Sequence, residues 1–199
     1  MATLTPKERE TVLLLLKDYT NFYNANSISK VINMSHVGAQ KIFRRLLQEN
    51  LLVNKTIGKS ITYKLNFNDA YARQLAAFLL ADEANRFKRW KEEFKELFKK
   101  DRIIMLFGSA IKDYAHAHDI DLMIVMGKME KREIKEINTV LKKKEEILPK
   151  KLHVIKLTST DLLDNLKQKN KAIIDIVKNA IILYGQDKYV EILRNVTSF

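Results

Sequence analysis

The residues from Ile103 to Met126, IIMLFGSAIKDYAHAHDIDLMIVM, constrain the fold of this chain more than any other stretch. Two apolar runs typical of buried strands flank a Gly-Ser pair, a polar loop and two aspartates at alternate positions. Alternate side chains of a strand project to one face, so Asp119 and Asp121 should lie together. An ionised carboxylate near an apolar interior needs a cationic partner or a metal. The pattern therefore predicts a charged site between two buried strands.

Gly108 and Ser109 follow the first apolar run, Ile103 to Phe107. Glycine allows a close approach of the backbone, and a helix that opens at Ser109 would direct its free N–H groups at an anion. Two carboxylates beside such a cradle suit Mg²⁺, or Mn²⁺, bridging to the phosphates of a nucleotide. The plainer alternative is a simple turn at Gly108 and surface ion pairs between the aspartates and bases such as Lys112.

An apolar strand, Gly-Ser, a loop of about ten residues and Asp-x-Asp in a second strand resemble the signature of the nucleotidyltransferase superfamily related to DNA polymerase β. Within it, the pattern is similar to the small stand-alone group called minimal nucleotidyltransferases. This chain has LFGS, nine residues from Ala110 to His118, and DIDLMIV.

The resemblance implies a role for each motif residue. Gly108 and Ser109 would hold the outer phosphates of an NTP, with ATP expected, and Asp119 and Asp121 would be the catalytic residues that bind magnesium. The implied reaction transfers a nucleoside monophosphate to a hydroxyl acceptor. A protein, a small molecule and a nucleic-acid end all stay open as acceptors.

The sequence departs from the family pattern in the loop and in a later strand. The loop AIKDYAHAH lacks the usual Arg-x-Arg-Gly character. The family also places a third carboxylate on a later strand, whereas the matching strand here, Lys151 to Leu157, offers His153 or Lys156. Neither is a hard-cation ligand like an acid. The alternative function is therefore a DNA-binding transcriptional regulator whose transferase fold is inactive or only senses nucleotide; a structural partner protein is a third reading.

Other polar residues near the motif have simpler explanations. Asp161 and Asp164 follow the later strand, but Ser159-Thr160-Asp161 is typical of a helix cap. The loop residues Asp113, His116 and His118 could touch a substrate, although solvated loop positions are the simpler expectation.

The first third of the chain has the pattern of a winged helix-turn-helix domain. Thr5 to Glu8 resembles a capping box with proline at the first helical position, and Ser27 and Ser35 are predicted to cap two further helices. Two β-like runs, Leu52 to Thr56 and Ile61 to Leu65, would form the hairpin or wing.

This stretch resembles the winged-helix family, which implies binding of duplex DNA by the helix from Ser35 and by the wing. A protein-docking or dimerisation module is the alternative. Arg45 is expected on the outer face of the helix beside Arg44. The candidate DNA-binding residues are His36, Gln40, Lys41, Arg44, Lys55 and Lys59.

Residues 68–100 are predicted to form a connecting helix or helices, capped at Asn68 or Asp69 and interrupted near Asp82-Glu83. Two apolar stripes follow its helical spacing. The first stripe is expected to make contact between domains or in a homodimer, and it holds Tyr71, Leu75, Phe78 and Leu79. The second is expected to pack in the core, and it holds Phe87, Trp90, Phe94, Leu97 and Phe98.

The expected fold class is an α/β (α+β) mixed-sheet nucleotidyltransferase domain preceded by a mainly α winged-helix domain. The predicted boundaries are 1–67 for the winged helix, 68–100 for the connection and 101–199 for the transferase-like domain. The last domain is expected to hold a lysine-rich helix over Glu130 to Leu148 and three later helices, over Ser159 to Lys169, Ala172 to Tyr184 and Asp187 to Val196.

Charge and composition agree with a nucleic-acid or nucleotide partner. The formal net charge is +12, and residues 1–67 hold ten Lys and Arg against four Asp and Glu. A merely basic, soluble surface is the alternative explanation. The absence of cysteine, of a signal-peptide pattern and of a long apolar run predicts a cytoplasmic protein without membrane contact.

Overall fold

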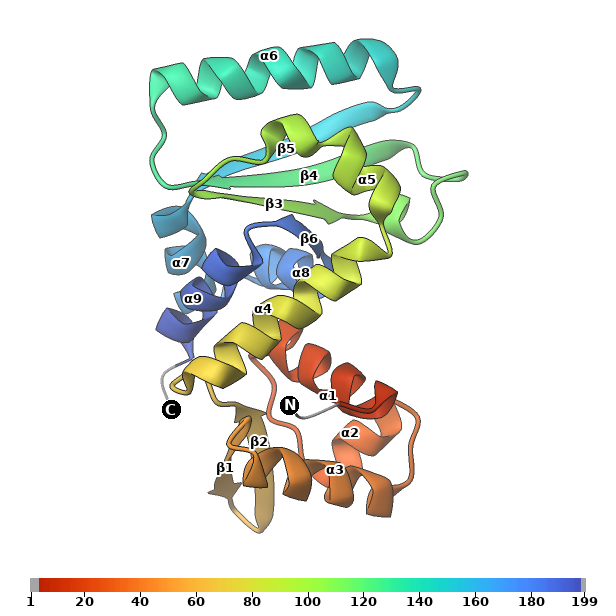
Figure 1. Ribbon diagram of the computed structural model, residues 1–199, viewed down its shortest axis with the longest axis vertical. Coiled ribbons are helices and arrows are strands. Elements are labelled where there is room, and N and C mark those ends of the chain that lie inside the picture. The colour runs from red at the N-terminus through yellow and green to blue at the C-terminus, as the bar shows by residue number, and fades with distance from the viewer. Residues whose placement is uncertain (1–3, 198–199) are drawn as a thin grey trace. The chain divides into compact units, whose positions relative to one another are not determined.

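The computed structural model describes residues 4–197, which form two compact units that meet in sequence between Leu79 and Leu80 (Figure 1). The first unit holds α1 (Pro6–Lys17), α2 (Ala25–Val31), α3 (His36–Gln48), β1 (Leu52–Ile57), β2 (Ser60–Leu65) and the first part of α4 (Ala70–Asn85). The second holds the end of α4, then α5 (Lys88–Glu93), η1 (Lys95–Leu97), β3 (Arg102–Phe107), η2 (Ser109–Ile111), β4 (Asp119–Met126), α6 (Lys131–Ile147), β5 (Lys151–Thr158), α7 (Ser159–Lys167), α8 (Lys171–Asn179), β6 (Ile181–Tyr184) and α9 (Gln186–Val196).

The helices of the first unit begin at capping residues. Thr5 and Glu8 form the expected capping box of α1, and the Ser35 hydroxyl accepts a hydrogen bond from the backbone N–H of Gly38 at the start of α3. The prediction that Ser27 caps α2 is wrong. Asn24 is the cap, and Ser27 completes a reciprocal capping box with it from three residues later.

A two-stranded antiparallel hairpin of β1 and β2 follows α3, with Leu52 opposite Leu65. Phe43 of α3 stacks on Tyr63 of β2 with ring centroids 4.0 Å apart, which ties the hairpin to the helices. Arg45 does not lie free on the outer face of α3 as predicted, because its guanidinium contacts the Glu8 carboxylate at 3.0 Å. The order of three helices and a hairpin is the one that the sequence pattern predicts.

The connecting segment is interrupted twice rather than once. The side chain of Asp69 accepts from the N–H of Ala72 at the start of α4, and α4 ends at Asn85, a few residues after the predicted break. Tyr71 and Phe78 of the first apolar stripe are exposed, whereas Trp90, Phe94 and Leu97 of the second are buried.

The second unit contains a mixed four-stranded sheet with strand order β5-β4-β3-β6. β3 is antiparallel to both β4 and β6, whereas β4 and β5 are parallel and are joined by the α6 crossover. Buried side chains at even positions, such as Ile104, Leu122 and Ile124, join Trp90, Phe94 and Ile137 in a core on the side of α5 and α6. The odd positions of β3, β4 and β5 face α7, α8 and α9, which contact these strands on the opposite side (Figure 1). In β6 the alternation is reversed, and Ile181 and Leu183 belong to the core on the side of α5 and α6.

The prediction of one helix from Ala172 to Tyr184 is wrong. α8 ends at Asn179, and Ile181–Tyr184 forms β6, the strand that pairs with β3. A short apolar run does not distinguish a buried strand from a helix, so the periodicity of the sequence missed this change. Gly185 forms the sharp link from β6 to α9, with φ of +79° and no room for a Cβ beside the carbonyl of Arg102.

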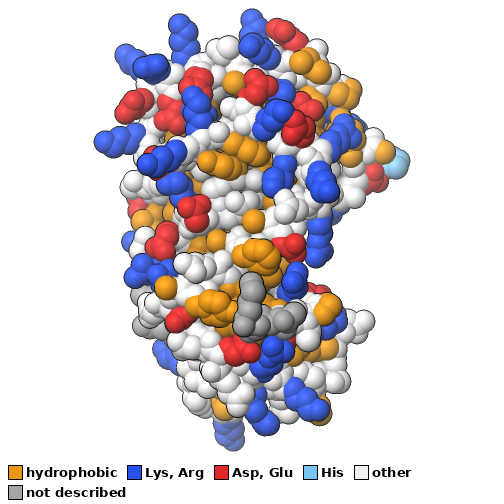
Figure 2. Space-filling model, in the orientation of Figure 1, with side chains coloured by type: hydrophobic (Ala, Val, Ile, Leu, Met, Phe, Trp, Pro, Cys, Tyr) orange, Lys and Arg blue, Asp and Glu red, His pale blue; other side chains and the backbone are white. Residues whose placement is uncertain are grey.

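The lysine-rich helix α6 forms as expected, with Ile137 and Leu141 buried. Figure 2 shows many Lys and Arg side chains over this helix, at the top of the view. None of the helices within residues 4–197 has the length and apolar character that crossing a membrane requires.

Candidate active site

Asp119 and Asp121 occupy the first and third positions of β4 and project from the same face of the sheet. Ile120 and Leu122 point to the opposite face and are fully buried. The apolar positions thus fix the orientation of the strand, because a shift by one residue would bury both carboxylates. The two aspartate side chains stay 29% and 20% exposed, so solvent reaches the pair.

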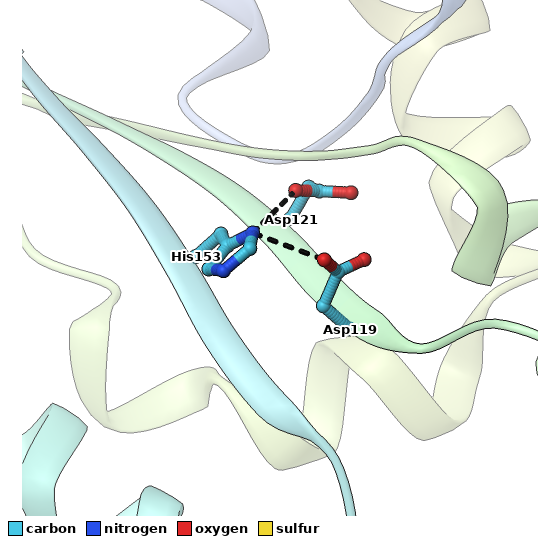
Figure 3. Close-up of side chains that lie close together, drawn as sticks. All are labelled: Asp119, Asp121 and His153. Carbon is cyan, nitrogen blue, oxygen red and sulfur yellow. Dashed lines mark ion pairs between the residues drawn. The ribbon is translucent and has the colours of Figure 1, made fainter.

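His153 of β5 completes this cluster. β5 pairs with β4 in parallel, with His153 in register with Asp121. Its Nδ1 lies 3.0 Å from Oδ2 of Asp119 and 3.7 Å from Oδ1 of Asp121 (Figure 3). Within residues 4–197, these three side chains form the one group of three or more acidic or histidine residues whose ligand atoms all lie within 4.8 Å of one another. The sequence offered either His153 or Lys156 in place of a third carboxylate, and the structure brings only His153 to the aspartates.

Lys156 and the later aspartates serve other parts of the fold. The Lys156 ammonium donates to the side-chain oxygen of Asn138 on α6. Thr158 is the cap of α7, and Asp161 closes its capping box by accepting from the N–H of Thr158. Asp164 is an exposed residue of the same helix. No later aspartate therefore takes the place of the third carboxylate among the described residues.

The electrostatic environment of Asp121 disfavours its charge. Burial, followed by repulsion from the nearby Asp119 carboxylate, raises the pKa of Asp121 above its ordinary value, and the His153 ring opposes both effects. A group held in this way gains more than an ordinary surface carboxylate does from a nearby cation. The pair is thus suited to binding positive charge.

Gly108 lies against the Asp121 side chain and can only be glycine in this geometry. Its φ is +79°, and a Cβ built there would lie 2.0 Å from Oδ2 of Asp121. The register explains this closeness, because Phe107, the last residue of β3, is opposite Asp121. The Gly-Ser motif and the Asp-x-Asp motif are therefore parts of one site.

The helix predicted at Ser109 does not form. Ser109–Ile111 is a single 3₁₀ turn in which the Ser109 carbonyl accepts from the N–H groups of Lys112 and Asp113. The exposed Ser109 side chain and the nearby Lys112 ammonium are the polar groups that this turn presents.

An open hollow of about 420 Å³ lies next to this turn. Phe107 to Ser109 and Lys112 line one side. Asp175, Ile176 and Asn179 of α8 line the other. The approach of α8 to the Gly-Ser turn could not be predicted from the sequence, because that contact depends on how β6 returns the chain beside β3. A second hollow of about 390 Å³ lies on the other flank and includes His153, Lys150 and Lys151.

The loop between the two motifs is held by its own contacts. The His116 ring nitrogen Nδ1 lies 2.6 Å from the Asp113 carboxylate, and both residues are exposed. His118 is also exposed, and the Lys150 ammonium donates to the backbone carbonyls of Ala115 and Ala117. These contacts shape the loop without bringing its histidines into the group around Asp119.

The candidate DNA-binding residues of the first unit are all exposed. His36, Gln40, Lys41 and Arg44 follow helical spacing on α3, and Lys55 and Lys59 belong to the hairpin.

Residues 92–189 match the model of the family described as Polymerase beta, Nucleotidyltransferase. The matched region includes the Gly108–Ser109 turn, both aspartates and His153. The match supports the nucleotidyltransferase superfamily for this part of the chain and suggests nucleotidyl transfer in general. Domains of this family typically use a divalent metal and an NTP. The chain matches no curated protein and no solved structure.

Proposed function

We propose that this protein is a divalent-metal-dependent nucleotidyltransferase that transfers a nucleoside monophosphate from an NTP, with ATP the expected donor, to a hydroxyl acceptor. The observation that carries the proposal is the convergence of Asp119, Asp121 and His153 beside Gly108, inside the region that matches the family. Carboxylate oxygens and an imidazole nitrogen are all donors used by divalent ions. The side chains present therefore fit a metal.

In this proposal each residue has a distinct task. Asp119 and Asp121 hold the ion, and Gly108 lets the backbone approach while keeping Asp121 in place. Ser109 and Lys112 contact the phosphates of a nucleotide that lies in the adjoining hollow. When bound, the ion supplies Lewis-acid stabilisation of negative charge on the phosphates and on the departing pyrophosphate.

The bond changes define the reaction class. The acceptor oxygen bonds to the α-phosphorus while the bond from this phosphorus to the oxygen bridging the β-phosphorus breaks. Pyrophosphate leaves, and the hydroxyl proton passes to the solvent that reaches the partly exposed Asp119. The second hollow, beside His153 and Lys151, is where we expect the acceptor.

Transfer of label from α-³²P-labelled NTPs tests this proposal. Each of the four NTPs is incubated with the full chain, Mg²⁺ or Mn²⁺, and a soluble cell extract as the pool of acceptors. We expect Asp119→Asn and Asp121→Asn each to lower label transfer by about 10³-fold or more, because both carboxylates act on the transition state. Asp164→Asn, an exposed carboxylate of α7, is the matched control and should leave transfer unchanged. Unchanged transfer in both site variants would contradict the proposal.

A second candidate is a DNA-binding regulator whose transferase-like unit senses nucleotide without transferring it. The missing third carboxylate favours it, because the group in the described residues consists of Asp119, Asp121 and His153 instead of three acids. Calorimetry with ATP and Mg²⁺ distinguishes the candidates in combination with the label assay. Metal-dependent ATP binding without any label transfer would favour the regulator.

We also propose that the first unit is a winged helix that binds duplex DNA through α3 and the hairpin. The exposed side chains of His36, Gln40, Lys41 and Arg44, and the excess of ten basic over four acidic residues in 1–67, support this role. Lys55 and Lys59 are then placed for contact with phosphates.

Salt-dependent binding to a DNA duplex tests this role. Lys41→Ala plus Arg44→Ala should reduce the slope of log K against log salt by about 2, since each lost phosphate contact removes about 0.9. Lys100→Ala plus Lys143→Ala removes the same charge from exposed sites of the second unit and should leave the slope nearly unchanged. Binding that does not depend on salt would contradict the DNA role.

A further inference from the structure

The imidazole of His153 gives the candidate metal site a donor set that differs from two or three carboxylates alone. The ring is 63% exposed, so packing does not force it toward the aspartates. It nevertheless lies with Nδ1 between the two carboxylates, 3.0 Å and 3.7 Å from their nearest oxygens (Figure 3). The backbone accounts for this position, because parallel pairing fixes His153 beside Asp121 on the same face.

The distances suit a shared ion. Two ligand atoms each about 2.1 Å from one ion and at right angles to each other are about 3.0 Å apart. This separation is the one observed between Nδ1 of His153 and Oδ2 of Asp119. The oxygen of Asp121 at 3.7 Å lies within the range of ligands at wider angles. The ligand atoms of all three side chains lie within 4.8 Å of one another, which is close enough for them to converge on one ion.

An imidazole ligand changes which ion is preferred. Mg²⁺ is a hard ion that favours oxygen ligands and water, whereas imidazole nitrogen suits first-row transition ions. For a given mixed N/O site, affinity rises from Mn²⁺ to Co²⁺.

We propose that His153 is the third ligand of this site and that it makes the site selective for a transition-metal ion over Mg²⁺. The inference rests on the proposed function, because it assigns the metal ion of that same site. It predicts that the preference for Co²⁺ over Mg²⁺ depends on residue 153, whereas the binding of any divalent ion depends on the two aspartates.

Metal binding to the full chain without nucleotide tests the inference. Calorimetric titration gives the affinities for Mg²⁺, Mn²⁺ and Co²⁺, and the visible absorption of Co²⁺ reports a nitrogen ligand. We expect Co²⁺ to bind about 30-fold or more tightly than Mg²⁺, with Mn²⁺ between them. His153→Ala should weaken Co²⁺ binding about tenfold or more and shift its absorption, and His116→Ala, an exposed loop histidine, should do neither.

The variant His153→Asp tests the source of the metal selectivity most directly. His153→Asp restores an all-carboxylate set, so the ratio of Co²⁺ to Mg²⁺ affinity should fall about tenfold through tighter Mg²⁺ binding. Because the ring is largely exposed, both variants are expected to fold, which circular dichroism and urea unfolding check. A ratio that does not change in His153→Asp, or Co²⁺ binding that His153→Ala leaves intact, would overturn the inference.

A further variant separates this failure from failure of the proposed function. If Asp121→Asn abolishes metal binding while both His153 variants match the wild type, the site exists and only the role of His153 is wrong. If the wild type binds no divalent ion, or Asp121→Asn binds as the wild type does, the proposed metal site is wrong and the inference falls with it.

Discussion

The charged side chains at the two ends of the β3–β4 strand pair differ in their burial and in their partners of opposite charge. At one end Arg102, opposite Met126, is only 2% exposed. Its guanidinium contacts the carboxylates of Glu133 and Glu136 at 2.8 Å and 3.3 Å and donates to a backbone carbonyl. At the other end, Asp119 and Asp121 lie together and meet one exposed imidazole.

This difference distinguishes a charge that the fold neutralises from the charges to which we assign a function. The buried guanidinium has fixed partners on α6, so its charge is neutralised within the fold. The aspartates repel one another, which helps to raise the pKa of Asp121. Such an arrangement lowers stability and is characteristic of sites that bind a ligand. A cation bound at the aspartate end would neutralise the charges of Asp119 and Asp121, as Glu133 and Glu136 neutralise that of Arg102.

Among variants that leave the charged side chains themselves unchanged, the largest expected effect comes from disturbing the aspartate end through its backbone. In Gly108→Ala the new Cβ would meet Oδ2 of Asp121 at 2.0 Å, so the carboxylate must move. We expect label transfer to fall by about 10² to 10³-fold, because small displacements of a metal-binding carboxylate are costly to catalysis. Initial rates with an α-labelled NTP measure this loss.

Gly58→Ala is the matched control for that experiment. Gly58 also has a positive φ, of +59°, but its Cβ position has no atom within 4 Å. The substitution should cost about 1 kcal/mol of stability in the hairpin and leave transfer unchanged. Equal loss of transfer in both variants would show that backbone strain, not contact with Asp121, is responsible.

Removing the two glutamate charges beside Arg102 should lower the stability of the fold and leave the affinity for metal unchanged. Glu133→Gln plus Glu136→Gln leaves the buried Arg102 without a counter-charge, so we expect the free energy of unfolding to fall by about 3 kcal/mol. Urea unfolding followed by circular dichroism measures this change. Glu145→Gln plus Glu146→Gln, exposed on the same helix, should change stability by about 0.5 kcal/mol or less. Loss of metal affinity in the first double variant, in protein that is still folded, would contradict the separation of the two ends.

The smallest effect is a gain in stability at the aspartate end. Because the pKa of Asp121 is raised in the folded state, folding stability falls as pH rises from 3.8 through the raised value. Asp121→Asn should therefore increase the free energy of unfolding at pH 7 by about 0.5 kcal/mol in metal-free buffer. The gain should shrink as the pH falls toward 3.8. A loss of stability at pH 7 would show that the pair is not repulsive.

The sequence predicted the placement of the two aspartates where strand alternation determines it. A buried apolar face at Ile120 and Leu122 forces Asp119 and Asp121 to the other face. The contact of Gly108 with Asp121 follows from the register of β3 with β4 and was not predicted. Periodicity could not reveal that His153 rather than Lys156 approaches the aspartates, because the register of β4 with β5 is set by the α6 crossover.

The remaining errors have local physical causes. The run Ile181–Tyr184 is too short to distinguish strand from helix, so β6 was missed, and with it the approach of α8 to the Gly-Ser turn. Ser109 was expected to open a helix, yet the chain makes one 3₁₀ turn before the polar loop. In the first unit the helix order was predictable from caps, whereas the inward ion pair of Arg45 with Glu8 depends on tertiary packing.

A crystal structure of the chain with Mn²⁺ and a non-hydrolysable ATP analogue would show whether the two aspartates hold a metal ion beside a nucleotide. We expect an anomalous peak within ligand distance of the Asp119 and Asp121 carboxylates, with the nucleotide phosphates beside Gly108 and Ser109. A nucleotide or an ion bound elsewhere, with both carboxylates still facing only His153, would contradict it.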